Sequence, residues 1–211
     1  SRIPFPTSHP LWAGNLPTKS DAIADILSTY DAIFALGGKS LITILYSDAS
    51  AVPANCCVYQ LSADVRDLGR TYATPLSVVG EVKASLRSLQ LLLDELTAPR
   101  RDAYVALLRQ AQVRRSAQRR ALDAEADAAM DAQTIPPLVA AREVVRAIGA
   151  DVAIVDEAIA TSGYVRRFLD SDSPNQYSFL RGGGLGWGMP AAVGCSLGLG
   201  REPVVCMVGD G

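Results

Sequence analysis

Glycine is concentrated at the C-terminal end of this sequence, where ten of the 17 glycines lie between Gly182 and Gly211. Because glycine has no Cβ, it lets the backbone turn sharply or approach a bound group closely. The same stretch contains an apolar run at 204–208, typical of a buried strand, with Gly209 and Asp210 directly after it. Ligands of open α/β sheets bind at the carboxyl ends of the strands. The pattern therefore predicts a parallel sheet with a ligand site at its C-terminal edge.

Runs typical of strands and helices alternate along most of the chain. Short apolar runs predict buried parallel strands at 31–36, 57–62, 151–155 and 204–208. Apolar residues at helical spacing predict helices over about 22–27, 75–96, 138–148 and 190–199. Residues 176–181 are too polar to be predicted as a strand. Such alternation is characteristic of an α/β fold with parallel strands.

A charged connector divides the chain into two parts. Residues 98–132 are rich in Ala, Arg and Asp, which predicts a solvated helical linker between domains at 1–97 and 133–211. We expect both domains to be incomplete, since the sequence has no initial Met and stops at Gly211, just after a predicted strand.

Composition argues against several classes of function. Lys plus Arg number 20 against 22 Asp plus Glu, and the basic part of the linker is followed at once by acidic residues, so we expect no nucleic-acid partner. No apolar window approaches the roughly 18 residues of a membrane-spanning helix, and no secretory signal begins the sequence. The four cysteines lack CxxC spacing, which predicts free thiols in a cytoplasmic protein rather than disulfides or a zinc site.

Two glycine motifs suggest nucleotide binding. The turn 37–40 (Gly-Gly-Lys-Ser) lacks the earlier glycine that a P-loop needs, because Ile33 stands at that position. The segment 186–191 fits the G-x-G-x-x-A dinucleotide fingerprint, although no clear strand precedes it and the glycines before it are unexplained. A non-catalytic module that binds NAD or FAD therefore remains an alternative, as does a structural remnant that binds nothing.

The segment 181–194 (Arg-Gly-Gly-Gly-Leu-Gly-Trp-Gly-Met-Pro-Ala-Ala-Val-Gly), with the helix, the strand and Gly209-Asp210-Gly211 after it, resembles the cofactor-binding domain of thiamine-diphosphate-dependent enzymes. The resemblance is to the pyruvate oxidase, acetolactate synthase and benzoylformate decarboxylase group, and most nearly to benzoylformate decarboxylase. Residues 5–10, the strand ending in Gly37-Gly38, and residues 61–64 resemble the central domain of that group. The resemblance implies two three-layer α/β domains, a Rossmann-like central domain at 1–97 and a cofactor-binding domain at 133–211.

The same resemblance implies thiamine diphosphate and Mg²⁺ as cofactors. Asp210 corresponds to a metal ligand, Leu185 to the apolar wedge under the bent cofactor, and the carbonyl of Gly183 to the acceptor for its aminopyrimidine. The implied cofactor-binding residues are Glu157, Thr161, Ser162, Gly183, Gly184, Leu185, Gly209, Asp210 and Gly211. A buried core leucine is the alternative for Leu185, and an ordinary turn is the alternative to phosphate binding by Thr161 or Ser162.

The implied activity is a lyase or carboligase reaction on a small 2-oxo acid, through the C2 carbanion of the cofactor, in a homo-dimer or homo-tetramer. The group's activating Glu lies in an N-terminal domain that this sequence does not contain. No catalytic residue is therefore assigned, and the fragment alone is expected to be inactive. FAD is not expected, because no glycine fingerprint precedes Asp64.

Two further positions bear on the substrate. Benzoylformate decarboxylase has a catalytic histidine at a place where this chain has Ile44, so the resemblance does not imply benzoylformate as the substrate. The one histidine, His9, lies in a proline-rich segment and is expected to be structural or exposed. Phe179 either lines an apolar substrate wall or is a core aromatic.

Overall fold

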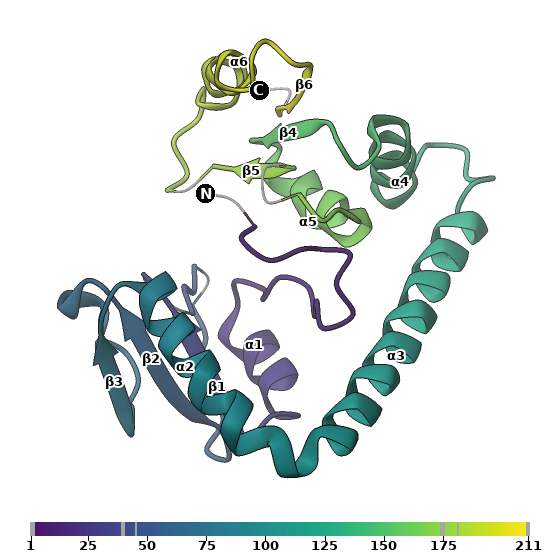
Figure 1. Ribbon diagram of the computed structural model, residues 1–211. Helices are drawn as coiled ribbons and strands as arrows, with labels where there is room; N and C mark the ends of the chain where they lie inside the picture. The colour runs from purple at the N-terminus through teal and green to yellow at the C-terminus, as the bar shows by residue number, and fades with distance from the viewer. Residues whose placement is uncertain (1–2, 39–40, 45, 174–175, 181, 210–211) are drawn as a thin grey trace. The chain divides into compact units, whose positions relative to one another are not determined.

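The computed structural model describes residues 3–38, 41–44, 46–173, 176–180 and 182–209. The chain divides into two compact units, one formed by residues 15–102 and the other by residues 1–14 together with 103–211. Each unit contains a three-stranded parallel sheet accompanied by helices (Figure 1). The predicted α/β class with two parallel sheets is confirmed.

The unit of residues 15–102 is built on a sheet with the strand order β1-β2-β3. Its elements are α1 (Ser20–Leu27), β1 (Ala32–Leu36), β2 (Cys57–Ser62), the short 3-10 helix η1 (Val65–Asp67), β3 (Leu76–Val79), α2 (Val82–Thr97) and η2 (Ala98–Arg100). A small core forms around α1, where Ile23, Leu27 and Ala51 are buried. α2 buries none of its residues fully within this unit.

The helix predicted over 75–96 is wrong at its start. Residues 76–79 form β3, which pairs with β2, and α2 begins only at Val82. The local cause is a cap, because the Glu81 side chain accepts hydrogen bonds from the N–H groups of Lys83 (3.0 Å) and Ala84 (2.6 Å). Val78 and Val79 followed by Gly80 are typical of a strand and a turn, but the apolar spacing over 75–96 favoured a helix in the prediction.

The other unit is built on a sheet with the order β5-β4-β6. Its elements are α3 (Arg101–Ala128), α4 (Pro137–Ile148), β4 (Ala153–Asp156), α5 (Ile159–Phe168), β5 (Tyr177–Phe179), α6 (Gly188–Gly198) and β6 (Val204–Met207). The buried core joins Ile154 on the central strand to Val165 and Phe168 of α5, Leu138 of α4, and Tyr177 of β5. None of the helices in the described parts of the chain is long and apolar enough to span a membrane.

Two elements of this unit differ from the prediction. β5 forms although residues 176–181 are polar, because Tyr177 pairs with Ile154 and is buried. Residues 159–168, for which no helix was predicted, form α5. The predicted linker is helical, as α3, and it is joined to α4 by the buried Arg142, which donates to the Asp127 carboxylate (2.5 Å) and to the carbonyl of Asp123 (3.1 Å).

The N-terminal segment packs with this second unit rather than with the residues that follow it. The N–H of Thr7 donates to the carbonyl of Ser171 (2.9 Å), and the N–H of Ser171 donates to the Thr7 hydroxyl (2.9 Å). Arg115 of α3 donates to the carbonyl of Thr7 (2.9 Å). Residues 1–14 were predicted within a domain spanning 1–97, so the contacts divide this chain differently, and the predicted boundaries stay a prediction for the domains of the whole protein.

Candidate functional site

Two adjacent carboxylates stand at the carboxyl end of β4, the central strand of its sheet. Asp156 pairs in register with Phe179 on one side and with Met207 on the other. Glu157 follows, and its N–H donates to the carbonyl of Met207 (2.7 Å). The exposed fractions of the two residues are only 1% and 8%. Buried carboxylates need hydrogen-bond donors, and each of these has its own set.

Asp156 binds groups on the β5 side of the sheet. One oxygen accepts from the N–H of Ala158 (2.8 Å), at the start of α5, and the other accepts from the hydroxyl of Tyr177. Burial raises the pKa of Tyr177 above its ordinary value of 10.0, and the hydrogen bond to Asp156 raises it further. Asp156 therefore joins β4, β5 and α5.

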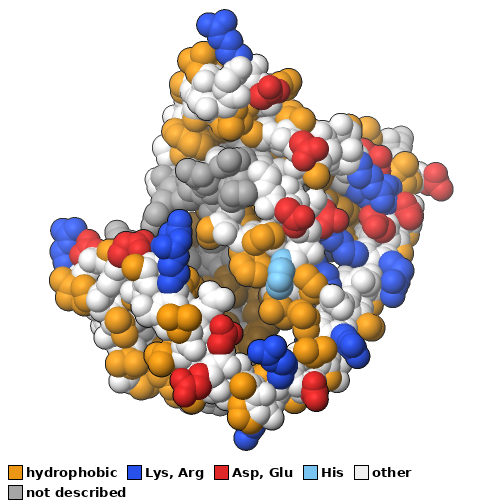
Figure 2. Space-filling view, in the orientation of Figure 1, with side chains coloured by type: hydrophobic (Ala, Val, Ile, Leu, Met, Phe, Trp, Pro, Cys, Tyr) orange, Lys and Arg blue, Asp and Glu red, His pale blue; other side chains and the backbone are white. Residues whose placement is uncertain are grey.

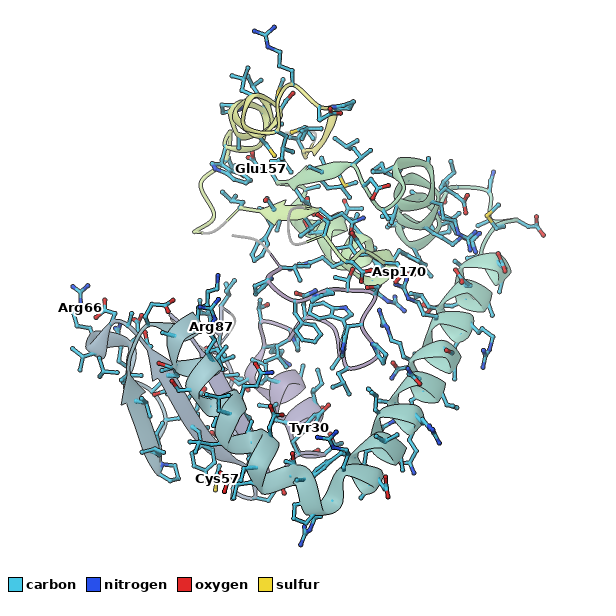
Figure 3. The ribbon with its side chains drawn as sticks, viewed as in Figure 1. Tyr30, Cys57, Arg66, Arg87, Glu157 and Asp170 are labelled. Carbon is cyan, nitrogen blue, oxygen red and sulfur yellow. The ribbon has the colours of Figure 1, made fainter. Side chains whose placement is uncertain are left out.

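Glu157 binds groups on the β6 side. Its Oε1 accepts from the N–H of Gly186, and its Oε2 accepts from the N–H of Gly188, the first residue of α6. Figure 3 shows Glu157 between β4 and α6. The N–H groups of both glycines of the G-x-G-x-x-A fingerprint are thus already bound to a carboxylate. They are not free for a dinucleotide pyrophosphate, which disfavours the dinucleotide-module alternative.

A pocket of about 540 Å³ opens beside Glu157 at this edge of the sheet. It lies among the start of α5, the glycine turn before α6, the start of α6 and the end of β6. Its lining residues are Glu157, Ala158, Ile159, Ala160, Thr161, Leu185, Gly186, Met189, Val208 and Gly209. The N-terminus of α5 has no side-chain cap, and a helix N-terminus favours anions.

The other side of the pocket is apolar. Leu185 is 72% exposed and Met189 is 68% exposed, and both line it. Figure 2 shows hydrophobic side chains gathered on the surface around α6. A pocket with a helix N-terminus on one side and aliphatic side chains on the other suits an elongated ligand with an anionic part and an apolar part.

The structure brings together four of the predicted cofactor-binding residues, since Glu157, Thr161, Leu185 and Gly209 all line this pocket. Gly183 and Gly184 precede Leu185 on an exposed stretch. Leu185 is exposed in this chain, so the alternative of a buried core leucine does not describe it. Asp210 and Gly211, the predicted metal ligand and its neighbour, lie outside the described residues. The roles of all these residues stay predictions.

Ser162 does not line the pocket. It is buried in the first turns of α5, where its side chain interacts with Tyr177. Thr161 alone of the two predicted hydroxyls reaches the pocket lining. Phosphate binding by Ser162 therefore finds no support in the geometry of this chain.

Other predicted positions lie away from the pocket. Phe179 is partly buried against the core and has the Arg166 guanidinium 5.6 Å from its ring centroid, as expected of a core aromatic. His9 contacts Phe5 edge-to-face and accepts a hydrogen bond from the N–H of Leu11 (3.1 Å), which is a structural role. Ile44 is exposed. All four cysteines are free thiols, of which Cys56 is buried, Cys57 is exposed, and Cys195 and Cys206 are partly buried.

A metal site is not evident in the part of the chain that the structure describes. No group of three His, Cys, Asp or Glu side chains there is arranged to hold an ion. The oxygens of Asp156 and Glu157 already accept N–H or O–H donors, so they are poor candidates. Gly209, which precedes the predicted ligand Asp210, does line the pocket. A carboxylate such as that of Asp210 is a suitable ligand for Mg²⁺, which prefers one or two carboxylates together with phosphate oxygens.

Sequence reasoning missed several lining residues, among them Ile159, Ala160 and Met189. The first two belong to α5, which was not predicted as a helix. The signal for Met189 was its place directly after Gly188, at the start of an expected helix.

Comparison with known proteins finds a family model that matches the C-terminal part of this chain. Residues 158–211 match the family described as the C-terminal TPP-binding domain of thiamine pyrophosphate enzymes. The chain resembles a thiamine-pyrophosphate-dependent enzyme. The matched residues include α5, the glycine turn, α6 and β6, which together form nearly all of the pocket.

Curated relatives carry the same resemblance. Benzoylformate decarboxylase from Pseudomonas aeruginosa is 27% identical over 214 residues, covering 100% of this chain and 36% of its own length. Sulfoacetaldehyde acetyltransferase from Castellaniella defragrans is 25% identical over 224 residues, covering 98% of this chain and 38% of its own. The chain thus spans little more than a third of the relatives that it matches. The predicted resemblance to the benzoylformate decarboxylase group is confirmed.

A solved structure supports the fold. The thiamine diphosphate-dependent 4-hydroxybenzoylformate decarboxylase of Rhodococcus jostii RHA1 matches with a TM-score of 0.69 and 23% identity, covering 100% of this chain and 36% of that one. At this level of identity the likeness speaks for the fold of the chain alone.

Proposed function

We propose that the pocket beside Glu157 binds thiamine diphosphate together with Mg²⁺, and that the chain is part of an enzyme that decarboxylates or ligates 2-oxo acids. The observation that carries the proposal is the pocket itself. It lies at the carboxyl edge of a parallel sheet, and nearly all of its lining comes from residues 158–211, the segment that matches a TPP-binding domain.

The polar end of the pocket suits the diphosphate. The N-terminus of α5 supplies the positive end of the helix dipole, and Thr161 adds a hydroxyl to the lining. We propose Asp210 as a ligand of the accompanying Mg²⁺, with Gly209 and Gly211 leaving room for the phosphates beside it. Glycine at these positions removes the side chains that would stand between backbone and ligand.

The apolar end suits the rings of the cofactor. We propose Leu185 as the wedge beneath them, Gly183 as the source of a carbonyl acceptor for the aminopyrimidine, and Gly184 as the spacer between the two. Met189 extends the same wall. When bound, the cofactor supplies an electron sink for breaking the bond beside the carbonyl of a 2-oxo acid, while the protein supplies position and electrostatics.

The substrate is proposed only at the level of a small 2-oxo acid. One relative is named as a decarboxylase and another as an acetyltransferase, so cleavage and acyl transfer both fit the resemblance. Ile44 stands where benzoylformate decarboxylase has a histidine, so benzoylformate itself is not proposed. We also propose a cytoplasmic homo-dimer or homo-tetramer without a nucleic-acid partner.

The test is calorimetric titration of the full-length protein, of which this chain is a part, with thiamine diphosphate in the presence and absence of Mg²⁺. Binding that requires the metal is expected. Binding of NAD or FAD instead would favour a dinucleotide module, and no binding of any of these would favour a structural remnant. The 211-residue chain alone is expected to show no decarboxylase turnover, because the resemblance places the activating Glu in another domain, and measurable turnover would contradict that expectation.

A further inference from the structure

We propose that Glu157 is a positioning residue that clamps the Leu185 turn, meaning residues 184–188, and so fixes the apolar wall of the pocket. The consequence for thiamine diphosphate rests on the function proposed above. The clamp itself rests on the contacts of this chain alone.

The first step is the anchoring of Glu157. It follows the central strand β4, its N–H is bonded to the carbonyl of Met207 (2.7 Å), and only 8% of the residue is exposed. A side chain on such a support has little freedom. Its carboxylate is therefore a fixed reference point at the edge of the sheet.

The second step is the pair of donors that it holds. The N–H groups of Gly186 and Gly188 lie one on each carboxylate oxygen, and Leu185 directly precedes the first of them. Hydrogen bonds to an ionised acceptor are roughly twice as strong as neutral ones. Two such bonds, two residues apart, fix both the place and the direction of the turn where it enters α6.

The third step is that packing does not hold the first part of the turn, residues 184–186. A Cβ placed on Gly182, Gly183, Gly184 or Gly186 would meet no atom within 4 Å, and Leu185 is mostly exposed. Glycines are also the residues with the most backbone freedom to lose. The Glu157 carboxylate therefore supplies an order that the surrounding side chains do not.

The fourth step is the close fit at Gly188. A Cβ there would lie 2.8 Å from Oε2 of Glu157, 3.1 Å from its Cβ and 3.1 Å from Cγ1 of Val208. Glu157 thus lies against the backbone of α6. Direct contact with the cofactor is not required for Glu157 to affect its binding, because the carboxylate acts through the turn that carries Leu185.

The neighbouring carboxylate gives an internal comparison. Asp156 holds the N–H of Ala158 at the start of α5, on the other side of the pocket. Loss of the Glu157 carboxylate should therefore loosen Gly186 and Gly188 while the Ala158 amide stays protected. A general loss of structure would affect all three amides.

The test uses Glu157→Gln and Glu157→Ala, with Glu202→Gln as the matched control because Glu202 is an exposed carboxylate after α6. The glutamine side chain has one oxygen that can accept a hydrogen bond and one NH₂ group that cannot. One of the two N–H groups, of Gly186 or Gly188, therefore loses its acceptor. Amide hydrogen exchange at Gly186 and Gly188 is expected to accelerate by about tenfold or more in Glu157→Gln, and further in Glu157→Ala. Exchange at Ala158 is expected to stay within about twofold, and Glu202→Gln should resemble wild type.

The second readout is the dissociation constant for thiamine diphosphate with Mg²⁺, measured by calorimetry. It is expected to rise by about tenfold or more in Glu157→Gln and to be unchanged in Glu202→Gln. Unchanged exchange at Gly186 and Gly188, or acceleration spread equally over β4, α4 and α5, would overturn the clamp. A wild-type protein that binds no thiamine diphosphate would overturn the proposed function and leave the exchange experiment to decide the clamp. Normal cofactor affinity in a Glu157→Gln protein with accelerated exchange would overturn the link between them.

Discussion

The N–H of Gly188 donates to the Oε2 atom of Glu157, across 31 positions of the sequence, and the two residues are in such close contact that a side chain at 188 has no room. This contact joins the end of a central strand to the start of a helix. It also lies at the wall of the pocket, so a change at Gly188 would affect both the packing of α6 and the proposed cofactor site.

Replacement of Gly188 by alanine is expected to destabilise the protein. The added Cβ would lie 2.8 Å from Oε2 of Glu157, which is closer than real Cβ atoms come, and 3.1 Å from both Cβ of Glu157 and Cγ1 of Val208, which is tighter than most real contacts. Overpacking of this kind costs about 1–3 kcal/mol. Urea unfolding of Gly188→Ala against wild type measures the difference.

The matched control is Gly194→Ala, in the same helix. A Cβ at 194 meets nothing within 4 Å, and alanine is favoured over glycine inside a helix by up to about 1 kcal/mol. Gly194→Ala is therefore expected to be as stable as wild type or more so. Equal stability of Gly188→Ala and Gly194→Ala would contradict the close fit at Gly188.

Replacement of Leu185 by alanine is expected to weaken cofactor binding without lowering stability. Leu185 is 72% exposed in this chain, so its truncation removes little core packing and should change the free energy of unfolding by less than about 0.5 kcal/mol. Burial of a leucine side chain against a ligand is worth about 1.5–3 kcal/mol, so the dissociation constant for thiamine diphosphate should rise about tenfold to a hundredfold.

Leu197→Ala serves as the comparison, since Leu197 is also largely exposed but does not line the pocket. It should leave cofactor affinity unchanged. An affinity for thiamine diphosphate that is equal in Leu185→Ala and wild type would count against the proposed place of the cofactor rings.

The sequence indicated the position of the site but not its internal contacts. The strand 204–208, the helix after the glycines and the α/β class all followed from local periodicity, and they are present as β6, α6 and the two parallel sheets. β5 was missed because it has only three residues, Tyr177–Phe179, and is stabilised by pairing with β4, which is distant in the sequence. Such a short strand shows little of the apolar periodicity from which strands are predicted.

The neighbouring carboxylates show the same limit. The strand predicted at 151–155 ends just before Asp156 and Glu157, and both residues stand at the carboxyl end of β4. Apart from the Ala158 amide, the groups that these carboxylates hold belong to residues 21 to 31 positions away, namely Tyr177, Gly186 and Gly188. Such partners come together only through the packing of β5 and α6 around β4, which no local pattern specifies.

Replacement of Tyr177 by phenylalanine is expected to destabilise the protein at neutral pH and to change how stability depends on alkaline pH. The hydroxyl donates to the buried Asp156 carboxylate, and leaving that oxygen unpaired costs about 1–3 kcal/mol. Urea unfolding at pH 7 measures this loss, with Tyr104→Phe, at an exposed tyrosine, as the control.

The alkaline behaviour follows from linkage. The pKa of Tyr177 in the folded protein is above its ordinary value of 10.0, so its contribution is fully present below pH 10 and is lost as the pH rises further. The stability gap between wild type and Tyr177→Phe should therefore narrow above pH 10. A gap that stays constant through that range would show that Tyr177 ionises equally well in the folded and unfolded protein.

Replacement of Glu81 by glutamine is expected to destabilise α2 in a manner that depends on acidic pH. Hydrogen bonds from the N–H groups of Ala84 and Lys83 hold the pKa of Glu81 below its ordinary value of 4.5. Its stabilising contribution is therefore present above pH 4.5 and is lost as the pH falls through the lowered pKa. Unfolding of wild type and Glu81→Gln should differ most at pH 7 and converge as the pH falls below 4.5 and through the lowered pKa. Glu95→Gln, at an exposed position on the same helix, should be as stable as wild type at pH 7, and equal stability of the Glu81 and Glu95 variants there would contradict the cap.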